Sequence, residues 1–326
     1  MTLTPRRRTA AAVALAGTLA LTGCGSDTGS GSGSGSADAQ ADGTTHAMDT
    51  AMGKVEVPED PERVVVLDTA ELDSALTLGV TPVGATVADA SQGFLDYFPE
   101  KKLSGIEQVG TIASPNLEKI ASLEPDLILS SKIRDAQRYD ELSAIAPTVL
   151  TETTGYPWKE NFLVHAKALG RTDEAEEVVD AYDTHVAETR KALGGSKEAA
   201  GTTVSMVRFI EGADTRLYGR KNYIGTILDD LGVGRPAIVD KAEDGFAYEV
   251  SPEQVDKGDA DVVFYSSYGA AEKSGEAEAV DSPLWKNLSA VRNGNAFHVE
   301  DDLWFMGIGY TAADRILDEM ATHLAG

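Results

Sequence analysis

Aromatic side chains and one arginine recur at the ends of predicted strands and in the loops that follow them. In open α/β sheets, ligands collect at the carboxyl ends of the strands. Aromatic faces and a few long donors hold a compact ligand by contact and hydrogen bonding, without reacting with it. The candidate ligand-binding residues are Trp158, Arg208, Tyr218, Tyr223, Phe246, Tyr268, Trp304 and Phe305. The alternative for each aromatic residue is packing inside a lobe, and the alternative for Arg208 is a solvated charge at a strand end.

The sequence does not indicate catalysis or a metal site. It contains no G-x-S-x-G elbow, no H-E-x-x-H and no G-x-x-x-x-G-K-[ST] loop. Residues 307–312 imitate a dinucleotide-binding turn, but no βαβ unit follows, so they predict the start of the last helix. None of the histidines has the close spacing that metal sites favour; they are His46, His165, His185, His298 and His323. We expect a binding protein with no catalytic residues, cofactor or metal of its own, and a surface-tethered enzyme or sensor is the alternative class.

One motif occurs in both halves of the chain. It reads "SPNLEKIASLEPDLILSS" over 114–131 and "SPEQVDKGDADVVFYSS" over 251–267. In both copies Ser-Pro is followed by a glutamate, Glu118 or Glu253, then by an Asp eight residues later and by an apolar strand that ends in Ser-Ser. This repetition predicts two similar lobes that face each other. A local alternative exists for both glutamates, because an early Glu complements the positive end of a helix dipole.

Short apolar runs alternate with helix-like stretches along the folded part of the chain. The strands expected from these runs are 63–67, 83–86, 127–129, 148–150 and 203–209. This alternation favours βαβ units and a mostly parallel sheet, which is an α/β fold. Because the folded part is longer than the usual single domain, we expect an N-terminal lobe over 53–170 and a C-terminal lobe over 196–326.

A single long helix is expected to join the two lobes over 171–195. Asp173 and Glu176 have the spacing of a capping box, and Gly194 and Gly195 end the pattern. Val178, Val179, Tyr182, Val186 and Leu193 form its apolar face. An ordinary amphipathic surface helix is the alternative.

The N-terminal segment has the features of a signal peptide that ends at a lipid-modified cysteine. Three arginines, 6–8, precede an apolar run over 10–21 that is too short to span a bilayer. The residues Leu21-Thr22-Gly23-Cys24 resemble the lipobox of bacterial lipoproteins, in which Cys24 would be diacylated after removal of 1–23. The Gly/Ser-rich segment 24–52 predicts a flexible tether. The alternatives are a plain exported protein with a stray thiol and an uncleaved helical anchor.

The chain is strongly acidic. It has 53 Asp and Glu against 28 Lys and Arg, a formal net charge of −25, and the three arginines of the signal peptide would be lost on maturation. Such a surface disfavours nucleic acid and anionic lipid as partners. We therefore expect attachment through the lipid alone, on the extracytoplasmic face of the cell membrane. With one cysteine, no internal disulfide is possible.

Several segments together carry a family resemblance; they are 61–84, 116–129, 145–149, 173–193 and 251–264. They resemble the iron-siderophore type of substrate-binding protein that serves an ABC importer. The resemblance implies two Rossmann-like lobes joined by one long helix, a ferric siderophore held in the cleft between them, and a monomer. It also implies that Glu118 and Glu253 dock onto arginines of the permease. Haem and cobalamin are the alternative ligands on this scaffold.

The charge of the chain favours one siderophore class, the ferric hydroxamates of the ferrioxamine kind. A ferric tris-catecholate is an anion that demands many cations, whereas a ferric trihydroxamate is neutral at iron. The basic residues near the expected cleft are scattered; they are Lys132, Arg134, Arg208, Arg216, Arg220 and Lys221. We expect Trp158 and Trp304 to pack against the ligand and Arg208 to donate to the hydroxamate oxygens.

Overall fold

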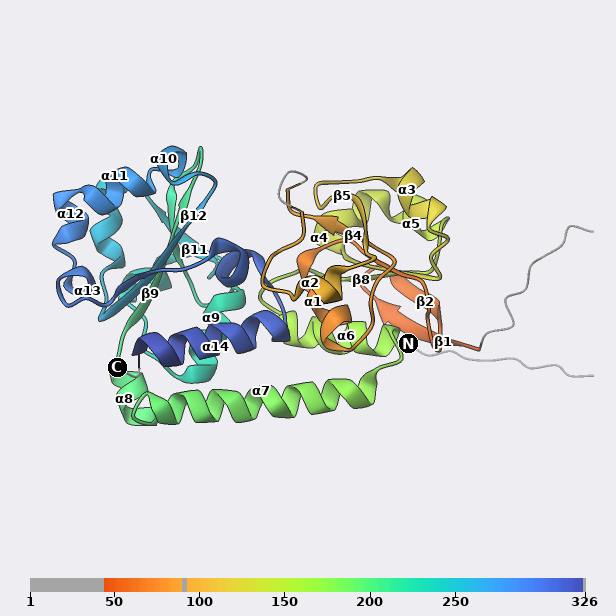
Figure 1. The fold of residues 1–326 in the computed structure, drawn as a ribbon, viewed down its shortest axis with the longest axis horizontal. Helices are drawn as coiled ribbons and strands as arrows, with labels where there is room; N and C mark the ends of the chain where they lie inside the picture. The colour runs from red at the N-terminus through yellow and green to blue at the C-terminus, as the bar shows by residue number, and fades with distance from the viewer. Residues whose placement is uncertain (1–43, 90–92, 325–326) are drawn as a thin grey trace, which may run out of the picture. The chain divides into compact units, whose positions relative to one another are not determined.

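Two sheets form the centres of two lobes in the computed structural model, which describes residues 44–89 and 93–324 (Figure 1). We take the N-terminal lobe as 44–170 and the C-terminal lobe as 196–324. The predicted signal peptide, Cys24 and most of the predicted tether lie outside the described residues. In the described part of the chain, no helix is both long enough and apolar enough to cross a membrane.

The N-terminal sheet is parallel except at one edge. Its strand order is β6-β5-β4-β3-β7-β8, and β6 alone runs antiparallel to its neighbour. Its strands are β3 Val64–Val66, β4 Gly84–Val87, β5 Glu107–Thr111, β6 Ser114–Pro115, β7 Leu127–Ser131 and β8 Thr148–Thr151. The central strands β3, β4 and β7 are buried along their whole length, as expected for a parallel sheet covered on both faces. The apolar runs in the sequence therefore predicted these strands correctly.

The C-terminal sheet is mixed, with the strand order β11-β10-β9-β12-β13. Strands β9, β12 and β13 are parallel, whereas β10 runs antiparallel to both β9 and β11. The strands are β9 Val204–Ile210, β10 Thr215–Tyr218, β11 Ala247–Val250, β12 Val262–Tyr268 and β13 Ala296–His298. Two α/β lobes with a connecting helix confirm the predicted fold class.

Helices cover the faces of both sheets (Figure 1). Those of the N-terminal lobe are α1 Thr69–Thr77, α2 Glu100–Leu103, α3 Leu117–Ser122, α4 Lys132–Asp135, η1 Ala136–Arg138, α5 Tyr139–Ser143 and α6 Trp158–Ala168. Those of the C-terminal lobe are α8 Ser196–Gly201, α9 Tyr223–Leu231, η2 Ala237–Lys241, η3 Pro252–Gly258, α10 Ala271–Ser274, α11 Glu276–Asp281, α12 Pro283–Lys286, α13 Ser289–Arg292, the π-helix η4 Asp302–Met306 and α14 Tyr310–Leu324.

A hairpin corrects the predicted end of the tether. Strand β1, Thr45–Thr50, pairs antiparallel with β2, Gly53–Pro58, so residues 45–52 belong to the fold. Met48 and Val57 bury their side chains in the core of the N-terminal lobe. The prediction failed because β1 is largely polar, and strand pairing satisfies its backbone without an apolar pattern.

Helix α7, Thr172–Ala192, connects the lobes and runs beneath both of them in Figure 1. Of its predicted apolar face, Tyr182 and Val186 are buried. The predicted capping box is wrong, because α7 begins after Arg171 and has no side-chain hydrogen bond at its cap. Helix α14 lies alongside α7, so two helices pass under the junction of the lobes.

The repeated motif has the same structural role in both lobes. Asp126 accepts hydrogen bonds from the backbone N–H groups of Glu62 and Arg63, at 2.8 and 3.0 Å, just before β3. In the other lobe, Asp261 accepts from the backbone N–H of Thr203 at 2.8 Å, just before β9. Each Asp therefore joins the start of its own strand to the start of the neighbouring parallel strand.

The two copies differ at their Ser-Pro starts. In the first, Ser114 and Pro115 form the edge strand β6, and α3 begins later, with Asn116 as its N-cap. In the second, Pro252 is the first residue of the 3₁₀-helix η3.

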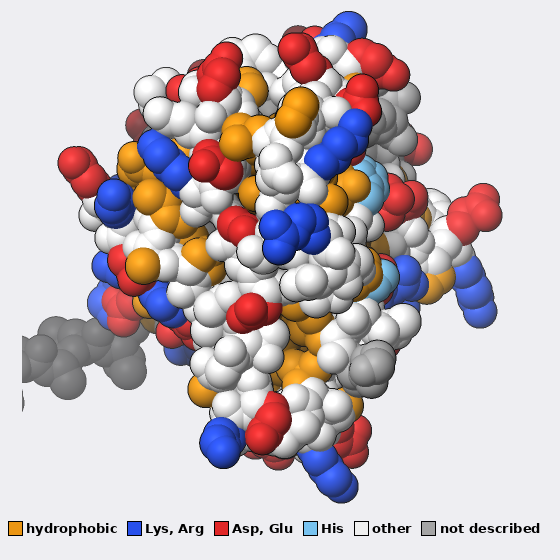
Figure 2. Space-filling model, turned by 90° about the vertical axis from the view of Figure 1, so that its left-hand side faces the viewer, with side chains coloured by type: hydrophobic (Ala, Val, Ile, Leu, Met, Phe, Trp, Pro, Cys, Tyr) orange, Lys and Arg blue, Asp and Glu red, His pale blue; other side chains and the backbone are white. Residues whose placement is uncertain are grey.

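The outer face of the C-terminal lobe, seen in Figure 2, carries acidic and basic side chains interspersed with apolar ones.

Candidate ligand-binding site

A cavity of about 610 Å³ lies between the two lobes. Its walls include β-strand ends and loops of both sheets, which is where ligands collect in α/β folds. Its volume is in the range of small-molecule sites, roughly 300–1,000 Å³. The N-terminal lobe contributes Asp68, Thr69, Ile112, Ile133, Arg134, Thr153, Thr154, Gly155 and Tyr156. The C-terminal part contributes Arg208, Arg216, Tyr218, Lys221, Asn222, Tyr223, Ile224, Asp244, Phe246, Trp304, Phe305, Met306 and Ile308.

Arg208 lies on β9 and is held from several sides. Its Nε donates to Oδ1 of Asp301 at 2.7 Å, and its Nη2 donates to Oδ2 at 2.5 Å. Its Nη1 donates to the hydroxyl of Tyr218 at 3.2 Å. Burial alone would lower the pKa of Arg208, but its partners Asp301 and Tyr218 outweigh burial and raise it. Arg208 is 7% exposed, so the alternative of a solvated strand-end charge is wrong.

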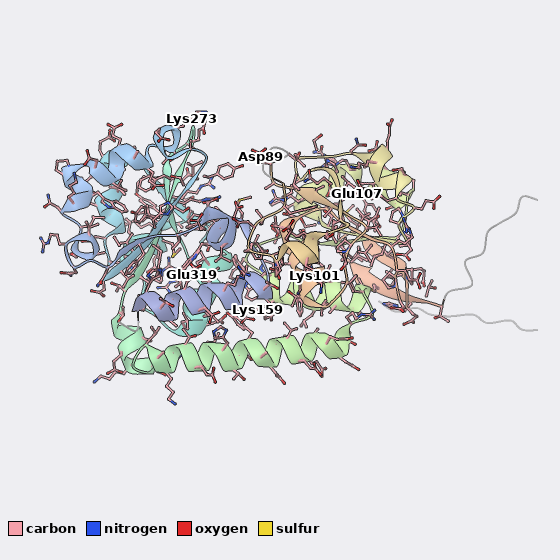
Figure 3. The ribbon with its side chains drawn as sticks, in the orientation of Figure 1. Asp89, Lys101, Glu107, Lys159, Lys273 and Glu319 are labelled. Atoms are coloured by element: carbon pink, nitrogen blue, oxygen red, sulfur yellow. The ribbon has the colours of Figure 1, made fainter. Side chains whose placement is uncertain are left out.

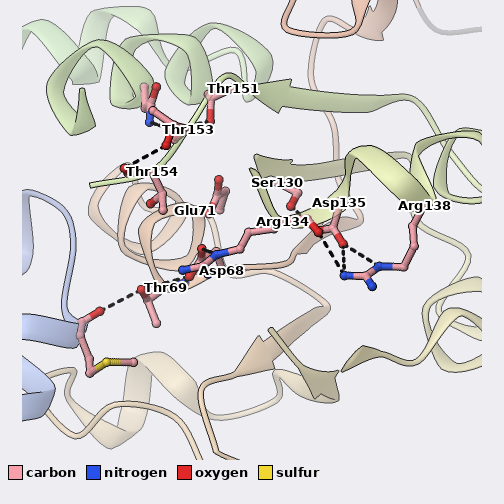
Figure 4. Close-up of polar contacts among 12 residues, drawn as sticks. Asp68, Thr69, Glu71, Ser130, Arg134, Asp135, Arg138, Thr151, Thr153 and Thr154 are labelled. Atoms are coloured by element: carbon pink, nitrogen blue, oxygen red, sulfur yellow. Dashed lines mark hydrogen bonds and ion pairs between the residues drawn. The ribbon is translucent and has the colours of Figure 1, made fainter. Parts of the chain in front are cut away.

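Arg134 is the corresponding cation of the N-terminal lobe. It lies on α4, directly after β7, and its Nε donates to Oδ2 of Asp68 at 2.7 Å (Figure 4). Asp68 is 1% exposed, follows β3 and caps α1, where its Oδ1 accepts from the backbone N–H of Thr69. Burial lowers the pKa of Arg134, but the charge and hydrogen bond of Asp68 more than reverse that effect. The cavity therefore has one paired arginine from each lobe.

Two further cations lie at the C-terminal side of the cavity. Arg216 pairs with Glu249 at 3.2 Å, whereas Lys221 is exposed and has no ion-pair partner among the described residues. Asp244 also lines this side. Together with Asp68 and Asp301, these groups give four positive and four negative charges in or beside the cavity walls. Of the six basic residues expected near the cleft, four therefore line the cavity, where carboxylates balance them. The other two do not line it, because Lys132 pairs with Glu152 and Arg220 pairs with Asp229 and Asp240.

Most of the predicted aromatic residues lie in the cavity wall. Tyr218, Tyr223, Phe246 and Phe305 line it, and Tyr268 lines an adjoining hollow of about 390 Å³. Phe305 and Tyr268 lie on the Arg208 guanidinium, with ring centroids 5.1 and 4.9 Å from its central carbon. Tyr223 is nearly buried, and its hydroxyl donates to the carbonyl oxygen of Gly309 at 2.7 Å.

Trp158 has a different role from the one expected. It begins α6 and is 3% exposed, and its indole Nε1 donates to Oγ1 of Thr226 in the other lobe at 2.7 Å. Its ring packs against Tyr182, Tyr223 and Tyr310, with centroids 4.7 to 5.7 Å away. Trp158 is absent from the cavity wall, so it joins the lobes, and the expected ligand contact is not supported.

Trp304 is among the residues around the cavity, but it is fully buried. Its side chain has no exposed area, stacks on Phe264 and donates through Nε1 to Glu319 of α14 at 2.6 Å. Glu319 is labelled in Figure 3. Trp304 therefore supports the wall that carries Phe305, and the predicted packing of its ring on a ligand stays a prediction.

Tyr156 is a cavity residue that the sequence analysis missed. It lies in the loop between β8 and α6, two residues before Trp158, and is 50% exposed. Ile133, which is 63% exposed, lines the same lobe's wall. Gly155, with φ of 84°, makes the turn that exposes Tyr156. This glycine at a strand end was the signal that could have identified Tyr156.

A buried carboxyl group lies behind Asp68. Glu71 is 1% exposed, its Oε2 has no hydrogen-bond partner among the described residues, and its Oε1 is 3.7 Å from Nε2 of His165. Burial and the charge of Asp68 raise the pKa of Glu71 to about 8. Burial lowers the pKa of His165 to about 3. Both pKa shifts favour the neutral form of the side chain.

Comparison with known proteins shows the family. Residues 64–303 match the family described as Periplasmic binding protein. The probable siderophore-binding lipoprotein YfiY of Bacillus subtilis is 38% identical over 287 residues, which cover 85% of this chain and 86% of YfiY. The Fe(3+)-citrate-binding protein YfmC of the same organism is 35% identical, covering 82% of this chain and 84% of YfmC.

A solved structure agrees with this match. Staphylococcus aureus SirA complexed with staphyloferrin B is 34% identical, with a TM-score of 0.76, covering 86% of this chain and 98% of SirA. These relatives are named as binding proteins, which agrees with the expectation that the chain is not an enzyme. The chain therefore belongs to the periplasmic binding protein family, as a ligand-binding protein with its cavity between two α/β lobes.

Proposed function

We propose that the chain is the siderophore-binding component of an ABC iron importer and delivers a ferric siderophore to the permease. The observation that carries this proposal is the cavity between the lobes, with a paired arginine from each lobe and aromatic side chains around them. A ferric siderophore already surrounds its iron with its own oxygens, so a protein must hold it from outside. The names of YfiY and SirA support the same ligand class.

Within that class, we propose a ferric hydroxamate of the ferrioxamine kind. The four cations of the cavity are balanced by Asp68, Asp301, Glu249 and Asp244, which leaves little net charge to attract a multiply anionic chelate. Exposed apolar side chains, Tyr156 and Ile133 on one lobe and Phe246 on the other, offer contact area for a neutral ligand.

A carboxylate chelate such as ferric citrate is the second candidate. Lys221 lines the cavity and has no ion-pair partner among the described residues, so it could pair with a ligand carboxylate. The name of YfmC, an Fe(3+)-citrate-binding protein, points the same way.

Quenching of tryptophan fluorescence tests this function. The purified full chain, which has three tryptophans, is titrated with ferrioxamine B, ferric citrate, a ferric tris-catecholate, haem and cobalamin. We expect saturable quenching by ferrioxamine B, and weaker or no quenching by the other four. Tighter binding of ferric citrate would select the second candidate, and tighter binding of haem or cobalamin would contradict the proposal.

We also propose that Glu118 and Glu253 are the contacts for the permease. Both are exposed, and each lies in the first turn of a short helix of its own lobe, α3 or η3. Hydrogen bonds from its own backbone and from Ser251 lower the pKa of Glu253, so it is ionised at pH 7. Two exposed carboxylates, one per lobe, suit arginines on a partner surface.

Attachment to the membrane through Cys24 completes the proposal. Cys24 lies outside the described residues, and its assignment rests on the order of the basic cluster, apolar run and small residues before it. Two acyl chains anchor a protein stably, whereas one gives only marginal binding. The binding protein would then work as a monomer on the extracytoplasmic face of the cell membrane.

A further inference from the structure

Arg134 and Arg208 each pair with a carboxylate of their own lobe, although Arg208 is buried and Arg134 is partly exposed. Asp68 holds Nε of Arg134 and also caps α1 (Figure 4). No other hydrogen bond from the Arg134 guanidinium is present among the described residues. Its terminal nitrogens therefore remain available to a ligand in the cavity that Arg134 lines.

In the C-terminal lobe, more of the guanidinium N–H groups of the cavity arginine are occupied than in the N-terminal lobe. Asp301, at the start of the π-helix, binds Arg208 along the edge formed by Nε and Nη2, and Tyr218 takes one N–H of Nη1. An arginine has five N–H donors, so one on each terminal nitrogen is left. With Tyr268 and Phe305 lying on the guanidinium, its plane is fixed. Arg208 thus offers a preset pair of donors.

We infer that Asp68 and Asp301 are positioning residues for ligand recognition, and that they set the net charge of the chelate that the cavity accepts. This inference rests on the proposed function. Arg208 is buried, so without Asp301 it would be an unbalanced positive charge in a weakly screened interior and would favour anions strongly. The side chain of Arg134 is 39% exposed, so the loss of Asp68 has a smaller effect of the same sign. With the carboxylate present, the arginine directs N–H groups at ligand oxygens without demanding a negative ligand.

Placement distinguishes this role from simple stabilisation of the fold. Buried ion pairs are poor stabilisers, because the cost of removing two charges from water can exceed their attraction. Both pairs nevertheless lie at the cavity, one in each lobe. Burial raises the pKa of Asp301 even though the neighbouring Arg208 lowers it. The removal of the Asp301 carboxylate from water is therefore only partly compensated by its bond to Arg208.

The test compares chelates of different charge. Calorimetric titrations of the purified full chain use ferrioxamine B, which has one free amine, cyclic ferrioxamine E, which has none, and anionic ferric citrate. For Asp301→Asn we expect the affinity for ferric citrate relative to ferrioxamine B to rise about tenfold or more, since the charge that is removed is largely buried and its partner Arg208 is buried. The change in affinity for ferrioxamine E should lie between the changes for ferric citrate and ferrioxamine B. Asp68→Asn should shift the ratio in the same direction.

Glu249→Gln is the matched control. It removes the same charge from beside another cavity cation, Arg216, but the side chain of Glu249 is 54% exposed. Solvent and salt screen such a charge, so the ratio should change by less than about threefold.

Loss of folding is separated from loss of selectivity by a second variant. The double change Arg208→Gln and Asp301→Asn replaces the ion pair by two amides, and it should return the ratio to near the wild-type value. Circular dichroism checks that each variant is folded. If the wild-type chain binds the chelates but folded Asp301→Asn and Asp68→Asn keep its ratio, this inference is wrong and the proposed function stands. If the wild-type chain binds none of the three chelates, both this inference and the proposed function are wrong.

Discussion

Asp73 of α1 accepts a hydrogen bond from the backbone N–H of Thr311, in the first turn of α14, at 3.1 Å. The same carboxylate accepts from the backbone N–H of Ala312 at 3.2 Å and from the hydroxyls of Tyr97 and Thr77 at 3.0 Å. A residue of the N-terminal lobe therefore caps the last helix of the chain. In a dinucleotide-binding turn, the N–H groups at the start of the helix bind a phosphate. Here the Asp73 carboxylate accepts hydrogen bonds from the corresponding N–H groups, which belong to the last residues of the turn-like segment 307–312.

Replacing Asp73 should destabilise the protein strongly. Asp73→Ala leaves two N–H groups of α14 and two hydroxyls without their buried acceptor, so we expect the free energy of unfolding to fall by about 2–4 kcal/mol. Urea unfolding followed by circular dichroism measures the change. Asp183→Ala, at an exposed position on α7, is the control and should change stability by less than about 0.5 kcal/mol. Equal stability of the two variants would contradict the capping role.

Glu71→Gln should alter the dependence of stability on pH. The pKa of Glu71 is raised from 4.5 to about 8 in the folded state, so its contribution to stability is complete below pH 4.5 and is lost as the pH rises through about 8. The loss is on the order of 5 kcal/mol. Glutamine stays neutral, so the variant should be more stable than the wild type at pH 9 and similar at pH 5.

Urea unfolding at pH 5, 7 and 9 measures this difference. Asp73 contributes a slope of the same sign, because burial raises its pKa to about 6, so the pH dependence should become weaker and not disappear. Glu188→Gln, at an exposed position on α7, should follow the wild-type curve. If the stability of Glu71→Gln depends on pH in the same way as that of the wild type, Glu71 is ionised in the folded protein and the prediction is wrong.

Tyr156 and Trp158 should have opposite phenotypes although they are two residues apart. Tyr156→Ala removes an exposed ring from the cavity wall, so ligand affinity should fall about tenfold with little change in stability. Trp158→Phe removes the indole donor to Thr226, so the free energy of unfolding should fall by about 1–3 kcal/mol with affinity nearly unchanged. Ligand titration and urea unfolding of both variants give the comparison, and the reverse pattern would restore the original prediction for Trp158.

Glu118→Ala and Glu253→Ala should leave ligand affinity unchanged and reduce uptake. Exposed charge pairs contribute about 0.2–1 kcal/mol each, so the double variant should lose far more transport than either single one. Uptake of radioactive iron by cells that carry each variant measures the effect. Glu124→Ala, another exposed carboxylate of the N-terminal lobe, is the control. Normal uptake by the double variant would count against permease docking.

Cys24→Ala should release the protein from membranes. Without its thiol the chain has no site for the diacyl group, and the acidic surface gives no electrostatic attraction to anionic lipids. Fractionation of cells followed by immunoblotting shows where the variant is found. Retention of Cys24→Ala in the membrane fraction would contradict the anchor.

The strands that are buried on both faces could be predicted from the sequence, because burial alone requires a run of apolar residues. Val64, Val65 and Val66 are fully buried, so an apolar run marks β3 directly. Strand β1 was missed because its residues are polar and pairing with β2 holds it in place. The Asp of the repeated motif is visible in the sequence, but its bonds to the neighbouring strand connect residues about 60 positions apart.

The candidate site was predicted less well because side-chain direction depends on the turn that precedes each residue. Trp158 follows Pro157 into α6 and points into the junction of the lobes, whereas Tyr156 stays in the cavity wall. Arg208 was identified correctly as a cavity residue, but its partner Asp301 lies 93 positions away. Only the assembled sheet brings such pairs together.

The shared position of α14 limits how this chain can be recombined with its relatives. The first turn of α14 is bound by Asp73 of the N-terminal lobe, and its body packs against α7 and supports Trp304 of the C-terminal lobe. The two lobes are therefore not exchangeable modules, although each has its own sheet. A chimaera cut within α7 would carry an α14 matched to one parent and a capping carboxylate from the other, so α1 and α14 must be transferred together.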